Sequence, residues 1–216
     1  MMRTNFILFF ICIFLFSCKK KEENYIISGY VTNPELNIAV SQMQVSLWGT
    51  KISSGTVQNQ QVKLGSYTTD AAGHFEFEFE KAVYSTIKIV LFKNDYFETE
   101  QNINPNNLNP GQSYNINISA HGLAWLKTIV KNIGSQYNED VLTYKLSLPY
   151  QNCSSCCSTE QKIFNGTGID TSWICPVYAG SKISVQWIYS YNQNIQPHFD
   201  TLVINLNDTI THQLLY

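Results

Sequence analysis

Strict alternation of apolar and charged side chains in one short segment constrains the fold more than any other feature of this sequence. In residues 74–80, phenylalanine occupies positions 75, 77 and 79, and glutamate occupies positions 76, 78 and 80. Side chains at positions i and i+2 share one face of a β-strand, whereas a helix distributes them around its axis. The segment therefore predicts a strand with its phenylalanine face in a core and its glutamate face in water.

The same period of two recurs along the chain, and no stretch of three helical turns stands out. Residues 69–73 predict a turn before the phenylalanine strand, because Gly73 suits a positive φ. In the first half we predict strands at 26–31, 44–48, 86–92 and 114–118, with loops at 51–61 and 102–111. In the second half we predict strands at 123–130, 141–148, 183–190, 201–206 and 210–216. The predicted fold class is therefore all-β.

Short motifs of the first half follow one another in an order typical of a known family. The most specific is the hairpin YTTDAAGHF at 67–75, and the others are ISGYV at 27–31, VSLW at 45–48, KNDYF at 93–97, and NPG at 109–111 leading to INI at 116–118. Together, residues 25–119 resemble the carboxypeptidase regulatory-like domain, a prealbumin-like β-sandwich found in exported bacterial proteins. Asp95 stands where family members usually have glycine, and aspartate tolerates left-handed backbone better than most residues. The resemblance implies an accessory domain without catalytic residues.

Residues 120–216 begin the alternation again. Leu142, Tyr144, Leu146 and Leu148 share one predicted strand face, and further strands follow without a helix. We therefore expect two consecutive β-sandwich domains, at 25–119 and 120–216. The alternative is that the later strands extend the sheet of the first domain.

The N-terminus has the three parts of an export signal. Arg3 supplies positive charge, residues 6–16 are uninterrupted apolar residues, and Ser17 and Cys18 follow directly. The apolar run is about half the roughly 20 residues that a membrane-spanning helix needs. The sequence LFSC at 15–18 resembles the lipobox of bacterial lipoprotein precursors, in which the cysteine receives a diacylglycerol group.

This resemblance implies a signal peptide at 1–17 and acylation of Cys18, with palmitate among the acyl groups and the lipid bilayer as a partner. The alternatives are a secreted protein without lipid and a short uncleaved anchor. Residues 18–24 form a tether whose lysine-acidic cluster, 19–23, resembles the surface-export signal of lipoproteins in some Gram-negative phyla. We therefore predict an outer-membrane lipoprotein at the cell surface. A plain solvated linker and the periplasmic face are the alternatives.

Charge argues against nucleic acid as a partner. Charged residues make up 14% of the chain, the formal net charge is −2, and Arg3 is the only arginine. Binding to phosphate backbones depends on clustered lysine and arginine, which this sequence lacks.

Four cysteines, Cys153, Cys156, Cys157 and Cys175, form the most specific motif of the second half. In an oxidising compartment an even number of cysteines usually forms disulfides. Adjacent Cys156 and Cys157 bond to each other only with strain, so we expect one to pair with Cys153 and the other with Cys175. Four thiolates around zinc and a redox-active dithiol are the alternatives. The predicted disulfides would staple a segment, 151–172, that is rich in serine, threonine and glycine.

No arrangement of residues predicts catalysis, a cofactor or a metal. The four histidines, at 74, 121, 198 and 212, fall in separate segments, and no catalytic or phosphate-binding motif occurs. The glutamates at 76, 78 and 80 share an exposed face, where nothing desolvates one carboxyl group relative to another. We therefore expect a protein that is not an enzyme, with weak cation binding at these glutamates as the alternative.

Exposed aromatic residues are the remaining candidates for binding. Most are expected in the core, but Trp173, Tyr189 and Tyr191 lie beside the stapled segment or near a strand end and could stack against sugars. The sequence thus predicts a non-catalytic envelope or cell-surface lipoprotein that serves as a binding or accessory module for a glycan or protein partner. A structural spacer or a subunit of an envelope assembly is the alternative, and an enzyme of unknown type is a minor one.

Overall fold

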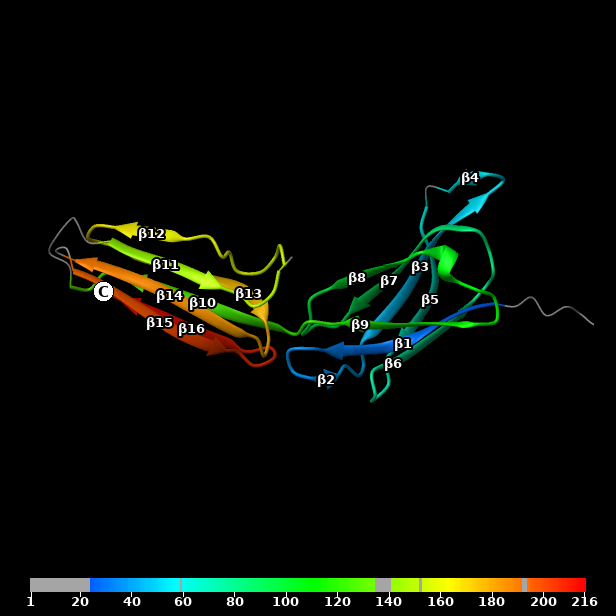
Figure 1. Ribbon diagram of the computed structural model, residues 1–216, viewed down its shortest axis with the longest axis horizontal. Coiled ribbons are helices and arrows are strands. Elements are labelled where there is room, and N and C mark those ends of the chain that lie inside the picture. The colour runs from blue at the N-terminus through cyan, green and yellow to red at the C-terminus, as the bar shows by residue number, and fades with distance from the viewer. Residues whose placement is uncertain (1–23, 59, 135–140, 152, 192–193) are drawn as a thin grey trace, which may run out of the picture.

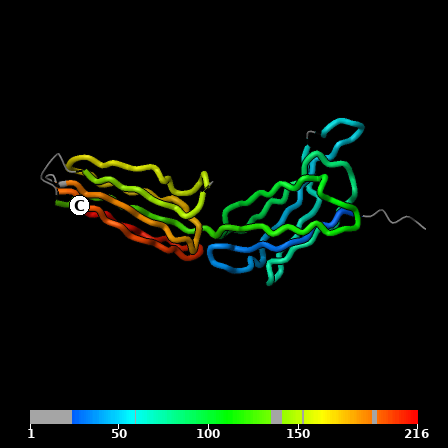
Figure 2. Tube along the Cα trace, in the orientation of Figure 1, coloured from blue at the N-terminus to red at the C-terminus, as the bar shows by residue number. Residues whose placement is uncertain are grey.

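The computed structural model describes residues 24–58, 60–134, 141–151, 153–191 and 194–216, which form β-strands almost throughout (Figure 1). Two hydrophobic cores follow one another along the chain, and Ala120 is the last residue of the first. We refer to residues 24–120 as the N-terminal half and to 121–216 as the C-terminal half. Figures 1 and 2 show the two halves end to end along the long axis of the molecule. The described residues contain no helix with the length and apolar character that spanning a membrane requires.

Two sheets enclose the core of the N-terminal half. In the first, β1 pairs antiparallel with β2 and β6 and parallel with β9. In the second, the order is β4, β3, β7 and β8, with β5 also beside β3. The bounds are β1 Tyr25–Asn33, β2 Ile38–Ala39, β3 Gln44–Ser53, β4 Thr56–Val57, β5 Val62–Thr68, β6 His74–Phe79, β7 Tyr84–Phe92, β8 Thr99–Ile103 and β9 Ser113–Ser119.

The phenylalanine strand is confirmed as β6. Phe75, Phe77 and Phe79 are buried in the first core, and the glutamates between them are exposed. The preceding turn is held by Asp70, whose Oδ1 accepts hydrogen bonds from the backbone N–H groups of residues 72 and 74. Gly73 has a φ of 77°, and a Cβ there would lie 2.5 Å from a backbone oxygen, so this turn requires glycine.

Both predicted loops of the N-terminal half contain regular structure. β3 continues to Ser53 and turns back through Ser54 and Gly55, both at positive φ, into β4. In the second loop, Asn104 caps a 3₁₀ turn at Pro105–Asn107. No sequence signal marks β4 and the 3₁₀ turn because both are short, both residues of β4 are exposed, and no residue of the 3₁₀ turn is buried.

Two sheets also enclose the core of the C-terminal half. One has the order β13, β10, β16, and the other has the order β12, β11, β14, β15. Each sheet of the described chain takes its strands from one half only. The bounds are β10 Leu123–Lys131, β11 Val141–Ser147, β12 Lys162–Asn165, β13 Asp170–Tyr178, β14 Lys182–Tyr191, β15 Asn194–Val203 and β16 Thr209–Leu215. The all-β prediction is therefore confirmed.

Three strands of this half were missed or shortened in the sequence analysis. β12 lies within the segment rich in serine, threonine and glycine, 151–172, and β13 begins inside it. β13 nevertheless pairs with β10 along its whole length. β15 begins at Asn194, well before the predicted strand at 201–206, and almost all of its side chains are exposed. A strand exposed on both faces shows no alternation of apolar and polar residues, so its sequence carries no periodic signal.

Candidate functional site

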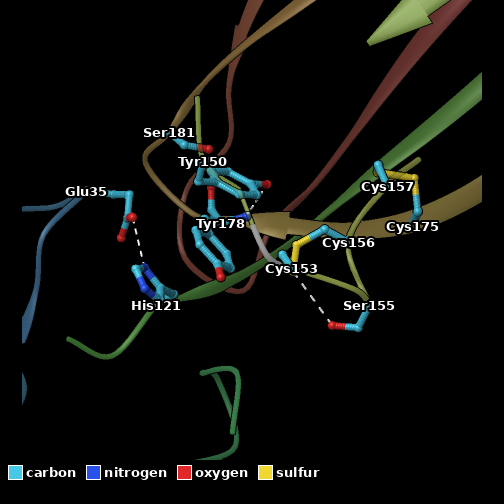
Figure 3. The surroundings of a disulfide bond; sticks show 10 residues. All are labelled: Glu35, His121, Tyr150, Cys153, Ser155, Cys156, Cys157, Cys175, Tyr178 and Ser181. Carbon is cyan, nitrogen blue, oxygen red and sulfur yellow. Dashed lines mark hydrogen bonds and ion pairs between the residues drawn. A yellow bond between two sulfur atoms is a disulfide. The ribbon is translucent and has the colours of Figure 1, made fainter. Parts of the chain in front are cut away.

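Two disulfide bonds organise the loop between β11 and β12 (Figure 3). Cys153–Cys156 closes a tight turn within the loop, with an S–S distance of 1.99 Å. Cys157–Cys175 joins the loop to β13, with an S–S distance of 2.06 Å. Cys157 is buried in the second core, and its N–H donates to the carbonyl oxygen of Pro176. The adjacent residues Cys156 and Cys157 therefore form disulfides with different partners, as the sequence predicted. None of the four cysteines is a free thiolate.

A hollow of about 450 Å³ lies against this loop. Its lining is mostly polar: Leu148, Tyr150, Gln151, Cys153, Ser154, Cys156, Cys157, Ser158, Thr159 and Glu160. Hydroxyl and amide groups of this kind can hydrogen-bond a polar ligand, but both cysteine pairs in the wall are oxidised. Across the described part of the chain, no three histidine, cysteine, aspartate or glutamate side chains gather into a metal-binding group. The hollow therefore presents hydroxyl, amide and disulfide groups to solvent.

Stacked rings connect the loop to the joint between the two halves (Figure 3). Tyr178 of β13 lies between two rings, with centroid distances of 3.9 Å to Tyr150 and 4.1 Å to His121. His121 Nδ1 is 2.9 Å from Oε1 of Glu35, which belongs to the N-terminal half. Burial raises the pKa of both tyrosines, so their hydroxyl groups stay protonated at neutral pH. The stack is suited to holding the halves together and not to proton transfer.

Main-chain contacts reinforce the joint. Phe97 N donates to the carbonyl oxygen of His121, and Leu123 N donates to that of Asp95. Leu206 packs against both hydrophobic cores. A Cβ on Gly122 would lie 2.6 Å from the Leu206 side chain, which would have to shift to accommodate a larger residue.

A second hollow, which we call the outer groove, lies on the solvent face of β11, β14 and β15. Its volume is about 110 Å³. The lining combines amide, hydroxyl, ammonium and apolar groups: Thr143, Lys145, Gln161, Gln186, Trp187, Ile188, Pro197, His198 and Phe199. The Phe199 side chain is 71% exposed, more than any other large hydrophobic residue of the described chain. This groove could not be predicted from the sequence because residues 194–200 are exposed on both faces of the strand and so show no alternation of apolar and polar side chains.

The aromatic residues proposed from sequence lie elsewhere. Trp173 is partly buried, with Phe164 stacked on it at 6.1 Å and Lys162 Nζ 4.1 Å from its centroid. Tyr189 is also partly buried and meets Tyr216 edge to face at 5.3 Å. Tyr191 ends β14, but its side chain lies outside the described residues. Trp173 and Tyr189 thus contribute to the margin of the second core and are not part of the outer groove.

The remaining candidates do not converge. The glutamates of β6 are exposed, and Glu80 pairs with Lys51 at 3.0 Å.

Trp187 contacts two histidines, with His198 stacked on it at 5.2 Å and His212 at its edge at 5.3 Å. Burial lowers the pKa of His212, although Asp200, 3.5 Å from its Nε2, acts in the opposite direction. Cys18 and the tether residues 18–23 lie outside the described residues.

Comparisons with known proteins leave the family open. No family model matches the chain, and no curated protein matches it in sequence. Similar solved structures include the TIE protein of Bacillus anthracis, with 12% identity, 88% of this chain and 33% of that chain covered, and a TM-score of 0.37. A 9R-lipoxygenase from Cyanothece PCC8801 has 15% identity, with 45% of this chain and 16% of that chain covered, and a TM-score of 0.29.

The shaft pilin SpaA from Lactobacillus rhamnosus GG has 6% identity, with 89% of this chain and 96% of that chain covered, and a TM-score of 0.30. This chain spans less than two thirds of the length of the Bacillus anthracis protein and of the lipoxygenase. These TM-scores are too low to carry an argument about function.

Proposed function

We propose that this chain is a non-catalytic, extracytoplasmic lipoprotein whose C-terminal half binds a glycan or protein partner through the outer groove. The observation that carries the proposal is the set of exposed apolar side chains on one sheet face. Ile163, Ile188, Ile195 and Phe199 are 55%, 41%, 69% and 71% exposed. Contiguous exposed apolar surface with a polar rim marks an interaction site in soluble proteins.

The chemistry of the described residues favours binding over catalysis. The cysteines are bonded in disulfides, and the buried tyrosines of the joint have raised pKa values. The glutamates of β6 face water, where no neighbour separates their acid and base roles. The outer groove contains hydrogen-bonding groups and no carboxylate, and the imidazole of its one lining histidine, His198, is stacked on Trp187.

Export and lipid anchoring follow from the N-terminal sequence. We propose cleavage before Cys18, acylation of that cysteine, and attachment to the outer membrane with the protein at the cell surface. The disulfides support an oxidising, extracytoplasmic compartment. We also propose that the halves are two domains, with a boundary near residue 120, and that the first is a carboxypeptidase regulatory-like accessory domain.

Detergent partitioning tests the anchor. The natural protein should enter the detergent phase, and a Cys18→Ala variant should accumulate as unmodified precursor or remain in the aqueous phase. A Cys12→Ala variant is the matched control, because Cys12 lies within the proposed signal peptide. Equal partitioning of the natural and Cys18→Ala proteins would contradict lipid attachment.

Substitution of the outer groove tests the binding role. Binding of the soluble chain to immobilised envelope glycans and envelope proteins should fall in a Phe199→Ser variant. Val83→Ser is the control, because Val83 is 66% exposed but lies in the N-terminal half. Equal binding by the natural protein and both variants would remove the outer groove as the binding surface.

A structural spacer is the second candidate function. The end-to-end arrangement of the halves and the stacked rings at their joint favour it (Figures 1 and 3). If the chain is a spacer, its function in cells should persist in the Phe199→Ser variant and should be lost when substitutions loosen the joint. Comparing Phe199→Ser with a Glu35→Gln, His121→Asn double variant in cells therefore separates the two functions.

A further inference from the structure

Strand register defines which side chains face outward around the outer groove. The side chains of Leu142, Tyr144, Ile183 and Val185 are buried in the second core, so their alternating neighbours on β11 and β14 face water. Lys145 pairs with Gln186, and Gln186 pairs with Phe199. An ammonium group, an amide and an exposed phenyl ring therefore form one row across three strands.

A second row lies two residues away on the same face. Ile163 pairs with Thr143, Thr143 with Ile188, and Ile188 with Pro197. The two rows together provide the apolar floor and the hydrogen-bonding groups of the groove. A few polar groups placed among apolar ones are typical of sites for small ligands and short polymer segments.

The outward positions of this sheet carry positive charge only. In the described residues of β11, β12, β14 and β15, they include two lysines and no carboxylate: Val141, Thr143, Lys145, Ser147, Ile163, Asn165, Lys182, Ser184, Gln186, Ile188, Ser190, Ile195, Pro197, Phe199, Thr201 and Val203. The one acidic residue of these strands, Asp200, faces inward near His212. Lys145 and Lys182 form no ion pair within the described chain, so an anionic partner would complement this face.

The Lys145–Phe199 row is long enough for linked sugars. Neighbouring strands lie about 4.8 Å apart, so the Lys145 and Phe199 main chains are separated by about 10 Å. A chain of sugars that lies along this row can stack one ring on Phe199 and present a carboxylate to the Lys145 ammonium group. The amides of Gln161 and Gln186 and the hydroxyl of Thr143 can hydrogen-bond sugar hydroxyl groups.

The edge of the sheet is less suited to binding than its face. β15 is the edge strand beside the groove, β12 is the opposite edge, and Pro197 near the middle of β15 has no N–H group to donate to an added strand. Strand addition at β15 by a second copy or by an extended peptide is therefore disfavoured. A polysaccharide needs no main-chain pairing and can lie across the strands along the Lys145–Phe199 row.

We infer that the outer groove binds a carboxylated polysaccharide, with a sugar ring stacked on Phe199 and a carboxylate paired with Lys145. This inference rests on the proposed binding function and names the chemistry of its partner. The carboxylate provides the charge complementarity, and the hydroxyl groups match the amide and hydroxyl lining.

Affinity electrophoresis tests the inference with three carboxylated polymers: polygalacturonate, hyaluronate and polysialic acid. Neutral dextran and fully methyl-esterified polygalacturonate are the uncharged comparisons. Phe199→Ala should weaken binding about tenfold or more, a loss of about 1.4 kcal/mol or more, because central aromatic residues carry much of the binding free energy in typical interfaces. Lys145→Gln should weaken it about fivefold, with a smaller dependence on salt than the natural protein shows.

Val83→Ala and Lys81→Gln, exposed sites in the N-terminal half, should bind as the natural protein does. Retardation by none of the three carboxylated polymers overturns the inference, and so does equal retardation by the methyl ester. If neutral dextran or an envelope protein binds instead, and Phe199→Ala abolishes it, the proposed function stands and the carboxylate assignment fails. Self-association that Phe199→Ala abolishes would assign the face to a second copy and would also overturn it.

Discussion

The two halves of the molecule build similar architectures with different means of stabilisation. The N-terminal half contains no cysteine, and its core includes three phenylalanines from one strand. The C-terminal half incorporates Cys157 into its core and ties it to β13 through a disulfide. In its loop, few aliphatic residues are available to offset the chain entropy lost on folding. The comparison shows that disulfide bonds stabilise a segment of the C-terminal half in which apolar and polar residues do not alternate.

Core truncation should separate the halves most strongly. Leu47 and Leu126 are fully buried, one in each core. Leu47→Ala and Leu126→Ala should each lower the free energy of unfolding of their own half by about 2–5 kcal/mol, because each leaves a cavity. Hydrogen exchange measured by mass spectrometry reports the two halves separately. If either variant destabilises both halves equally, they unfold as one cooperative unit and the comparison fails.

Removal of the long-range disulfide should act on one half only. Cys157→Ala with Cys175→Ala should destabilise the C-terminal half by about 3 kcal/mol, because the bond restricts the unfolded chain over a separation of 18 residues. Cys153→Ala with Cys156→Ala is the matched control, and its shorter separation of 3 residues predicts a loss of about 2 kcal/mol or less. Urea unfolding measures both losses. A shift of the N-terminal transition by the first pair would contradict independent stabilisation.

The contact between Glu35 and His121 at the joint should couple the halves with a smaller free energy. Glu35 and His121 are 15% and 26% exposed, so solvent screens their interaction incompletely. A double-mutant cycle with Glu35→Gln and His121→Asn should give a coupling free energy of about 1 kcal/mol. Small-angle scattering should also show a broader distribution of shapes for the double variant. A coupling free energy of zero would leave the stacked rings and the main-chain bonds as the whole joint.

The smallest expected effect is a pH dependence confined to the C-terminal half. Burial lowers the pKa of His212 in the folded chain below its ordinary value of about 6.5. Below that value the unfolded state binds more protons than the folded state does, so acid destabilises this half. The His212 contribution is complete above pH 6.5 and declines as the pH falls toward the folded pKa. Unfolding midpoints between pH 7.5 and 5 should fall less steeply in His212→Gln, and identical slopes would contradict this assignment.

The sequence predicted those parts of the fold in which side chains alternate between water and core. Local chemistry predicts the phenylalanine strand and the turn before it. It also predicts that the adjacent cysteines form disulfides with different partners. The outer groove could not be predicted in this way, because both faces of β15 are exposed and its apolar and polar residues do not alternate. Trp173 stays a predicted binding residue, and on β13 it is partly buried and contacts Phe164 and Tyr144. Which aromatic ring reaches solvent depends on strand register, which one strand alone does not determine.

Together with the proposed N-terminal anchor, the parallel pairing of β1 and β9 has a mechanical consequence. Tension enters β1 at Tyr25 and leaves β9 at Ser119, and the register between them extends from Ile26–Ser113 to Thr32–Ser119. Because the strands run in the same direction, pulling drives them past each other and shears the hydrogen bonds of this ladder together. The joint at His121 carries the same force through fewer hydrogen bonds. Under tension it should yield first, separating the two halves along the pull while the first sandwich stays closed.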